Sequence, residues 1–324
     1  MMTLLDLLAS PRLTLAGLVW LGMAVLAQYR LPELPSWQLV LPLALLALNL
    51  AAALVARPSL RASSGLFAFH LALIALMLLG GWGRLTHLDG RVEIVEGQAF
   101  SSTHPEITQR GPWHRDRLAE IDFVQGAYTV DYRPKLNRAH TLSEVVVLGK
   151  QFTVGDIEPL ILSGYRFYTT YNKGYALLLT WIPDAGRPET GAIHLPSFPL
   201  NDWQQKRRWQ APGGPQLDLI LDPGIKIDYL QAWQLDSRQL KPLLKLQWAK
   251  QNHELRPGQT LQLEGGRIHF EGVRGWMGYR IFYDPTLPWL LGCAIAGVLA
   301  LAWHLLGRFA IPKLTMGFQN ERSA

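Results

Sequence analysis

Histidine is the residue type in this sequence with the clearest capacity for chemistry, because a neutral imidazole ligates metal ions and carries protons near physiological pH. The chain of 324 residues has nine histidines, and two of them, His70 and His304, lie inside long apolar segments. An ionisable side chain in such a segment is costly and therefore marks a candidate functional site. The segment around His70, Gly65–Leu85, is about as long as a bilayer is thick.

The position of His70 allows two interpretations. Its helical neighbours are all apolar: Phe67, Leu73, Ile74 and Met77. In the first interpretation, the imidazole hydrogen-bonds a neighbouring helix and holds the two helices together. In the second, it is an axial ligand of haem iron, because imidazole is a usual haem ligand and an apolar wall suits a porphyrin. Counted from Gly65 at ~1.5 Å per residue, His70 lies about 8 Å into the membrane from the cytoplasmic face. The residues alone leave both interpretations open.

His304 and His87 are weaker candidates. His304 lies near the inner end of the last apolar segment, at a depth comparable to that of His70, so the two imidazoles could hold a haem between them. His304 is also close to Arg308, and an interfacial residue that reaches for water is the interpretation that we favour. His87 lies just outside Gly65–Leu85, where a second haem site could form, although a solvated loop histidine is the favoured alternative.

Other kinds of chemistry find little support in the sequence. The remaining histidines show no metal-ligand spacing such as HxxxH or HExxH. The single cysteine, Cys293, excludes an internal disulfide, a CxxC pair and a CxxCH haem-attachment motif. It lies in an apolar run, where we expect its thiol to be inert. The net charge is +6, but Lys and Arg are scattered, so a nucleic-acid partner is not expected. No catalytic residue is predicted.

Four apolar segments are each long enough to span a bilayer as a helix: Leu13–Tyr29, Trp37–Val55, Gly65–Leu85 and Leu287–Leu306. Ser63 or Ser64 is suited to cap the third helix. The sequence therefore predicts a polytopic α-helical membrane protein with four spans. We expect a three-span N-terminal membrane region (1–85), a β-rich domain (86–285), a fourth membrane span (286–307) and a tail (308–324).

Positive charge near the ends of the spans predicts their orientation. With four crossings, one side of the membrane receives most of the basic residues near the span ends: Arg12, Arg57, Arg61, Arg308, Lys313 and Arg322. The small loop on the other side offers only Arg30, which Glu33 offsets. We therefore expect both termini to be cytoplasmic and the β-rich domain to lie outside.

Between the third and fourth spans, short apolar or alternating runs recur between Gly and Pro residues, as is typical of β-strands. The predicted strands are Arg91–Val95, Ile121–Val124, Ala127–Tyr132, Glu144–Leu148, Arg166–Thr170, Tyr175–Trp181, Leu217–Ile220, Leu243–Trp248, Thr260–Leu263, Arg267–Phe270 and Tyr279–Tyr283. Short helices are expected only at Asp202–Gln210 and Ile227–Trp233. The sequence thus predicts a large extracytoplasmic all-β domain between spans three and four.

The order of these segments and three stretches of sequence resemble the ResB/CcsB family of cytochrome c biogenesis proteins, which belong to the route known as system II. The first stretch runs from Phe69-His70-Leu71 to Gly80 and is followed by Glu96-Gly97-Gln98. The others are Gly149 with Gly164-Tyr165-Arg166-Phe167-Tyr168, and the closing segment from Gly278 through Tyr283 to Pro288. The likeness covers essentially the whole chain. A Trp-rich WWD segment is absent, so the chain resembles the B half alone and not the fused form.

The resemblance implies a subunit of a holocytochrome c synthetase complex that binds haem b non-covalently and helps deliver it outward to apocytochrome c. In that family the third-span histidine ligates haem, a role that falls on His70, and the matching ligand usually comes from the partner. The implied partner is a CcsA/ResC-type membrane protein with a WWD segment. A thioredoxin-like thiol reductase is a further candidate partner. The implied location is the bacterial plasma (inner) membrane, with the large domain in the periplasm, and the chain is not expected to be catalytic alone.

Two other functions fit parts of the pattern. A membrane b-haem protein could pass electrons between quinone and an external reductase, but it should need two stacked bis-histidine sites. The predicted spans hold only His70 and His304. A non-haem scaffold could instead position the CcsA/ResC-type partner, with His70 as a contact between helices. A haem spectrum of the purified protein separates the scaffold from the haem-binding subunit.

Overall fold

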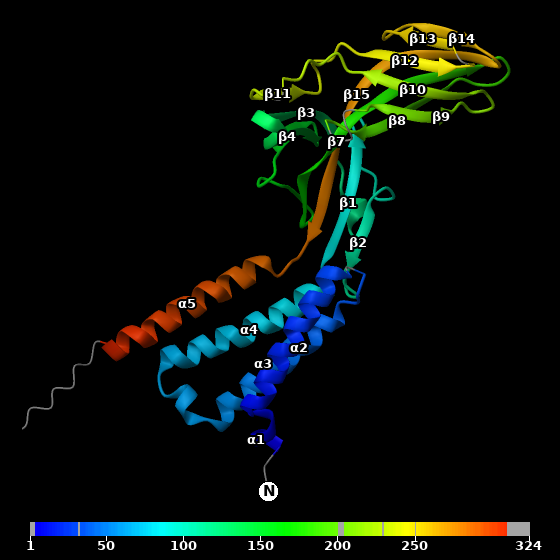
Figure 1. The fold of residues 1–324 in the computed structure, drawn as a ribbon. Helices are drawn as coiled ribbons and strands as arrows, with labels where there is room; N and C mark the ends of the chain where they lie inside the picture. Colours follow the sequence, from blue (N-terminus) through cyan, green and yellow to red (C-terminus); the bar gives the residue numbers. More distant parts are fainter. Residues whose placement is uncertain (1–3, 32, 200–203, 229, 250, 310–324) are drawn as a thin grey trace, which may run out of the picture. The chain divides into compact units, whose positions relative to one another are not determined.

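The computed structural model describes residues 4–31, 33–199, 204–228, 230–249 and 251–309 (Figure 1). The chain folds as two compact units. The first comprises Met1–His87, Gln109–His114 and Asp284–Ala324, and the second comprises Leu88–Thr108 and Arg115–Tyr283. The first unit contains the long helices, and the second contains almost all of the strands. The strand-rich unit is therefore inserted before the last helix of the helical unit.

The helical unit contains all four predicted apolar helices. Its elements are α1 (Leu4–Leu8), α2 (Pro11–Arg30), α3 (Trp37–Ala56), the 3₁₀ turn η1 (Pro58–Arg61), α4 (Ser64–Thr86) and α5 (Leu287–Phe309). By length and composition, α2 to α5 are each sufficient to cross a membrane. The four helices begin and end within three residues of the predicted segments, because a long apolar run is a strong local signal.

Polar side chains make hydrogen bonds near the ends of these helices. Ser63 caps α4, since its Oγ accepts a hydrogen bond from the backbone N–H of Leu66 (3.2 Å), as one of the two predicted caps. Asn49 is buried in α3, where its Oδ1 accepts from the Thr14 hydroxyl (2.6 Å) and its Nδ2 donates to the backbone oxygen of Leu8 (2.6 Å). Asn49 thereby ties the start of α2 to α3.

Helices α4 and α5 pack closely along small residues. A Cβ atom added at Gly65 would lie 2.8 Å from the backbone oxygen of Ala300 and 2.9 Å from the backbone nitrogen of His304. Two turns further along α4, Ala72 would meet a Cβ added at Gly297 at 3.2 Å. The order of these contacts makes the two helices antiparallel. Glycine is required at Gly65 because the backbones approach too closely for a side chain.

The described residues of the β-unit form three sheets. Its strands are β1 (Leu88–Val95), β2 (Glu106–Arg110), β3 (Val124–Arg133), β4 (Asn137–Val147), β5 (Lys150–Val154), β6 (Leu160–Leu162), β7 (Tyr165–Pro183), β8 (Glu189–Ser197), β9 (Lys206–Gln210), β10 (Gln216–Asp222), β11 (Trp233–Asp236), β12 (Leu243–Trp248), β13 (Gln251–Leu255), β14 (Thr260–Leu263) and β15 (Gly266–Tyr283). The largest sheet has the order β2-β1-β15-β7-β6, with β14 beside β15 and β8 beside β7. The other two have the orders β11-β3-β4-β5 and β13-β12-β10-β9.

Two long antiparallel strands, β7 and β15, run through the whole unit (Figure 1). Each of them covers two strands that the sequence predicts as separate. The sequence predicts a break because glycine often marks the end of a strand, and both strands contain internal glycines. A Cβ added at Gly174 would lie 2.9 Å from the Trp276 indole, and one at Gly275 would lie 2.8 Å from the Tyr128 ring. These glycines mark close approaches of aromatic rings and not turns. The register shifts between Phe270 and Gly272 and between Met277 and Tyr279 let the strands continue.

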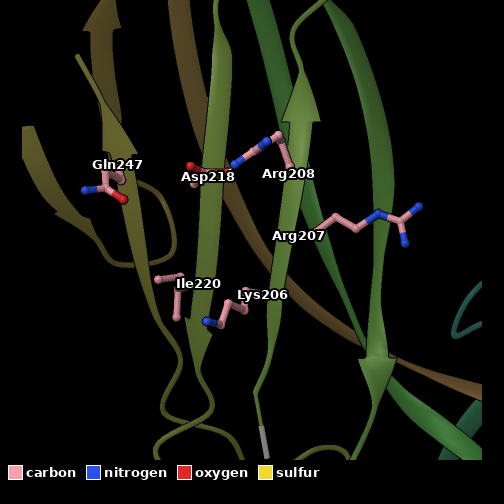
Figure 2. Close-up of a pocket in the computed structure, with 6 residues that line it drawn as sticks. All are labelled: Lys206, Arg207, Arg208, Asp218, Ile220 and Gln247. Carbon is pink, nitrogen blue, oxygen red and sulfur yellow. Dashed lines mark hydrogen bonds and ion pairs between the residues drawn. The ribbon is translucent and has the colours of Figure 1, made fainter. Parts of the chain in front are cut away.

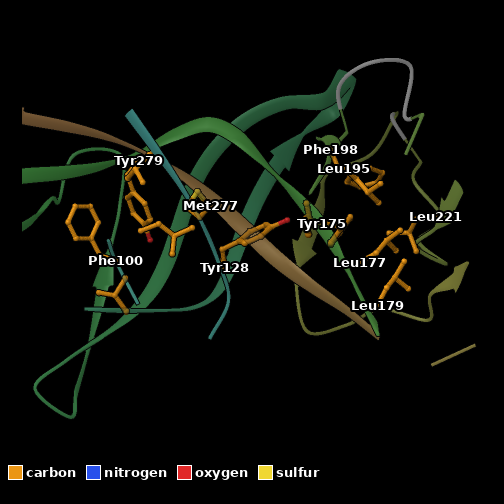
Figure 3. Packing of buried hydrophobic residues seen from close by; sticks show 14 of the residues in the cluster. Phe100, Tyr128, Tyr175, Leu177, Leu179, Leu195, Phe198, Leu221, Met277 and Tyr279 are labelled. Carbon is orange, nitrogen blue, oxygen red and sulfur yellow. The ribbon is translucent and has the colours of Figure 1, made fainter. Parts of the chain in front are cut away.

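One hydrophobic core joins the three sheets (Figure 3). Tyr279 lies in it near one end of the long strands, and Tyr128 lies near their middle, beside Gly174 and Gly275. Trp181 lies near the other end, under the turn at Gly214. A closed polar network also crosses the core. The Tyr279 hydroxyl donates to Gln125 Oε1 (2.6 Å), the Gln125 amide donates to Ser143 Oγ (2.8 Å), and Ser143 Oγ lies 2.7 Å from the Tyr279 hydroxyl. Each buried group in the network is therefore satisfied.

Several local predictions for this region are wrong. The segment predicted as a helix at Asp202–Gln210 contains strand β9 at Lys206–Gln210, while Asp202 lies outside the described residues. The described part of Ile227–Trp233 is irregular, and Trp233 begins β11. Ile121–Val124 is mostly irregular. β9 pairs with the following strand β10, Trp233 pairs with Tyr132 of β3, and Ile121 and Phe123 are buried, so tertiary contacts outweigh local propensity.

Candidate functional site

His70 lies in the second turn of α4 and is half-buried. Its Nδ1 is 2.7 Å from the backbone oxygen of Leu66, four residues earlier in the same helix. A carbonyl oxygen only accepts hydrogen bonds, so Nδ1 carries the proton and donates it to Leu66. In the neutral ring, the other nitrogen, Nε2, is then left with a lone pair. This is the tautomer in which an imidazole can ligate a metal, with its other N–H held by an acceptor.

The face of α4 that carries His70 is not the face that packs on α5. Gly65 and Ala72 contact α5. At about 100° per residue in an α-helix, His70 is about 140° around the axis from Gly65 and about 160° from Ala72. The side chains one and two turns further along on this side, Leu73, Ile74 and Met77, are half-buried and apolar. The imidazole therefore stands on an apolar face turned away from α5.

His304 belongs to the contact between α4 and α5. Its Nδ1 lies 2.6 Å from Ser63 Oγ, the hydroxyl that caps α4, and its backbone packs on Gly65. It is half-buried on α5. The structure therefore places His304 and His70 at the same end of α4 but on opposite sides of it. Of the two histidines in the described apolar helices, His304 is the one that connects two helices.

His87 is buried, with 4% of its surface exposed, so the favoured interpretation as a solvated loop histidine is wrong. Its backbone N–H donates to Gly83 and thereby ends α4. Its Nδ1 donates to the backbone oxygen of Arg84 (2.8 Å), and its Nε2 lies 3.3 Å from the side-chain amide of Gln109. Burial, and then the positive charge of Arg84, lower the pKa of His87 below its usual value. With both ring nitrogens in contact with protein groups, His87 stabilises the end of the helix.

The segment Gln109–His114 closes over the same end of α4, and the sequence analysis missed it. The N–H of Gly111 donates to the backbone oxygen of His87 (2.9 Å), and the N–H of Trp113 donates to that of Leu85 (2.8 Å). The ring of His114 donates from Nδ1 to the backbone oxygen of Thr86 (2.8 Å). We call this segment the collar of α4. It satisfies three carbonyl oxygens that the end of a helix leaves unpaired.

A close approach of backbones explains the glycine in the collar. A Cβ atom at Gly111 would lie 2.2 Å from the backbone oxygen of Leu85, nearer than any side chain permits. The one signal in the sequence is the run Arg110-Gly-Pro-Trp, in which glycine and proline mark a turn. Nothing local in that run indicates that the turn closes on a helix more than twenty residues earlier.

Among the described residues, no group of three or more His, Cys, Asp or Glu side chains is arranged to hold a metal ion. In the described part of the β-unit, a hollow of about 410 Å³ lies on the outer face of the sheet β13-β12-β10-β9 (Figure 2). It is open, and Arg208 donates there to Asp218 across 2.9 Å. An exposed ion pair of this kind contributes little, and the hollow contains no residue that the sequence analysis selected.

Four helices of membrane-spanning length, with a β-rich unit inserted before the last, indicate a membrane protein. The sequence model of the ResB-like family matches residues 49–251, more than half of the chain. The chain therefore belongs to the ResB-like family. Membership associates it, at a general level, with cytochrome c biogenesis. No curated protein shows significant sequence similarity to the chain. The matched region includes His70, His87 and the collar, and it ends before α5.

Proposed function

We propose that this chain is a subunit of a system II cytochrome c synthetase, that it binds haem b within the membrane through His70, and that it helps deliver the haem outward for attachment to apocytochrome c. Membership of the ResB-like family supports the general role. The observation that carries the site is the hydrogen bond from His70 Nδ1 to the backbone oxygen of Leu66. This bond leaves Nε2 as the ligating nitrogen.

The surroundings of His70 suit haem as a cargo. The hydrogen bond to Leu66 fixes the tautomer and the ring orientation and makes the ligating nitrogen more basic. Phe69 meets the imidazole edge-on at 5.6 Å, and the half-buried Leu73, Ile74 and Met77 offer an apolar wall to a porphyrin. Haem iron held by a neutral imidazole keeps one axial position for a second ligand.

A partner is the proposed source of that second ligand. His304 is the other histidine within a described apolar helix, and Ser63 holds it on the far side of α4 from His70. A membrane protein of the CcsA/ResC type, with a WWD segment, would supply an imidazole to the face of α4 that is turned away from α5. This arrangement also disfavours a membrane electron carrier, which needs paired imidazoles along the path of the electron.

The proposed topology places both termini in the cytoplasm, α2 to α5 in the bacterial inner membrane and the β-rich domain in the periplasm. Arg57 and Arg61 support this orientation. Arg57 donates to the backbone oxygen of Ala9 (3.0 Å), and Arg61 donates to that of Val55 (3.2 Å). Both guanidinium groups thus lie at the end of the bundle where α2 and α4 begin, on the proposed cytoplasmic side.

The β-rich domain is proposed to orient apocytochrome c as an extended peptide. Strand β5 is an edge strand, paired with β4 and exposed over its first four residues. An exposed edge can accept an added strand through its backbone groups. The proposed thioredoxin-like reductase would act on the thiols of apocytochrome c, because Cys293 is the single cysteine of this chain.

The test is the haem content of the full chain, purified from membranes with and without a coexpressed WWD-type partner. We expect His70→Ala to lower bound haem, read from the Soret band per mole of protein, by about tenfold or more, since even outer-sphere partners of a metal ligand are worth about 10–100-fold. His304→Ala is the matched control, because it removes an intramembrane histidine from the other face of α4, and we expect it to retain haem.

Two further readouts complete this test. Maturation of a CxxCH reporter cytochrome should fall with His70→Ala in the coexpressed pair and should be absent without the partner. Equal haem content in the wild-type chain and in His70→Ala would contradict the assignment of the ligand. A wild-type pair that carries no haem but still matures the reporter would favour the scaffold.

A further inference from the structure

Four exposed tryptophans gather at one end of the helical unit. They are Trp37 on α3, Trp82 on α4, Trp289 on α5 and Trp113 in the collar, with exposed fractions of 54%, 52%, 69% and 56%. Contacts place them at the same end: Gly81 faces Val40 of α3, Gly83 faces Thr286 just before α5, and the ring centroids of Trp82 and Trp113 are 5.5 Å apart.

The position of Trp82 matches the thickness of a bilayer. At 1.5 Å per residue, Trp82 lies about 27 Å along α4 from Ser64, close to the ~30 Å of a hydrocarbon core. Tryptophan is enriched at this boundary, because its ring is apolar and its N–H prefers water or lipid headgroups. Helix α4 alone therefore brings one exposed indole to the far interface.

Trp113 lies beside Trp82 at the same end of the helical unit, although it belongs to the collar and not to a helix. The chain leaves α4 at His87, enters the β-unit at Leu88–Thr108 and returns to the helical unit at Gln109–His114. The collar hydrogen bonds to Leu85, Thr86 and His87 hold this return segment on the last turn of α4. Arg110 and Pro112 in the same segment are exposed. The backbone is thus fixed, while the Trp113 indole stays exposed.

We propose that the collar is a membrane-surface anchor, in which Trp113 and Trp82 together bind the headgroup boundary of the lipid bilayer on the side opposite the termini. The inference rests on the proposed membrane topology and not on haem binding. An exposed indole pair suits the headgroup boundary, because the rings take the boundary region and their N–H groups reach water or headgroups. Because the collar holds the last turn of α4, the anchor sets how deep that helix, and with it His70, lies in the bilayer.

The test measures the depth of position 113 in vesicles made from the purified full chain without any partner. In a Cys293→Ser background, an environment-sensitive fluorophore is attached at Trp113→Cys, and quenching is compared between lipids with a nitroxide near the headgroup and aqueous iodide. Leu78→Cys, exposed on α4, is the membrane control, and Leu148→Cys, 90% exposed at the β4–β5 turn, is the aqueous control.

We expect the label at position 113 to be quenched severalfold more by the shallow nitroxide than the label at position 148, and severalfold less by iodide. Iodide quenching at position 113 equal to that at position 148 would overturn the anchor and would leave the exposed indole to a partner protein. If the label at Leu78→Cys also escapes lipid quenching, the membrane topology fails and the anchor fails with it. Haem content through His70 is measured separately, so the two proposals can fail independently.

A second variant tests whether the collar positions the indole. Gly111→Ala adds a Cβ that would lie 2.2 Å from the backbone oxygen of Leu85, so the collar must leave the end of α4. We expect shallow-nitroxide quenching of the label at position 113 to be lost in that variant. Gly191→Ala is the matched control, because nothing lies within 4 Å of a Cβ there. Unchanged quenching in Gly111→Ala would contradict the positioning role.

Discussion

At the scale of single residues, the most unusual side chain of the β-unit is Lys173, which is 3% exposed in β7. Its ammonium donates to the backbone oxygen of Tyr171 (3.2 Å) and lies 5.6 Å from the centre of the Tyr132 ring. Burial, and then the positive charge of Arg138, lower the pKa of Lys173 to about 8, although Asp156 acts in the opposite direction. A buried cation with a lowered pKa costs stability wherever it is charged.

The sign of that cost gives a prediction for Lys173→Met. The Lys173 amine takes up a proton with a pKa of about 10.4 in the unfolded chain. In the folded chain its pKa is only about 8. The wild type should therefore lose stability relative to the variant as the pH falls from ~10.4 to ~8, by about 3 kcal/mol at ~1.4 kcal/mol per pKa unit, and should lose no more below that range.

Denaturant unfolding of the full chain in detergent, followed by tryptophan fluorescence at a series of pH values, measures this difference. Lys150→Met is the control, since Lys150 is exposed in β5 and its removal should give a stability difference that is nearly independent of pH. A flat difference for Lys173→Met would mean that the lysine is equally protonated in the folded and unfolded chains.

At the scale of secondary-structure elements, the contact between α4 and α5 depends on the absence of side chains. Gly65 lets the backbone of α5 approach, and Ser63 and His304 then meet at 2.6 Å. The close packing of α5 on Gly65 also places His304 on the side of α4 opposite the face that carries His70. Element packing thus decides that His304, and not His70, connects α4 to α5.

Gly65→Ala should weaken this contact. The new methyl group would lie 2.8 Å from the backbone oxygen of Ala300, so the helices must separate, and overpacking of this kind costs about 1–3 kcal/mol. We expect a lower Tm in detergent and loss of the bond between Ser63 and His304. Gly292→Ala in α5 is the control, because nothing lies within 4 Å of its Cβ. Since alanine favours a helix by about 1 kcal/mol over glycine, the control should be slightly stabilised. Equal Tm changes in both variants would argue against close packing at Gly65.

At the scale of the whole molecule, a β-unit is inserted between two helices that pack against each other. The chain can return to the bundle because β1 and the last part of β15 are paired antiparallel, with Leu88 opposite Tyr283. The point where the β-unit begins is thereby next to the point where it ends. An insertion with adjacent ends disturbs the host unit little.

The proposed topology predicts opposite accessibility for two engineered cysteines in a Cys293→Ser background. Leu148→Cys in the β-unit should react with a membrane-impermeant maleimide in cells whose outer layers have been made permeable. Ser59→Cys, exposed between α3 and α4, should react only after the inner membrane is opened. The reverse pattern would invert the orientation, and labelling of both sites in intact membranes would contradict α4 as a single span.

The sequence by itself determined the four apolar helices, most of the longer strands and His70 as the principal candidate ligand, and it narrowed the cap of α4 to Ser63 or Ser64. These follow from local signals, namely the length of an apolar run, the period of a strand and the capping chemistry of a serine. Lys206–Gln210 shows the limit of such signals, because a segment expected to be helical becomes a strand when β10 pairs with it.

Only the tertiary structure decided the burial of His87, the separation of His304 from His70 and the position of Trp113. Each depends on a contact between segments that lie apart in the chain: the collar with the end of α4, or Ser63 with α5. The hydrogen bond from His70 to Leu66 forms within one helix and is therefore local. Whether the imidazole faces α5 or points away from it depends on how the two helices pack. Local composition encodes which segments are helices, whereas packing assigns each of their faces to another helix, to lipid or to a ligand, because burial is a property of the whole fold.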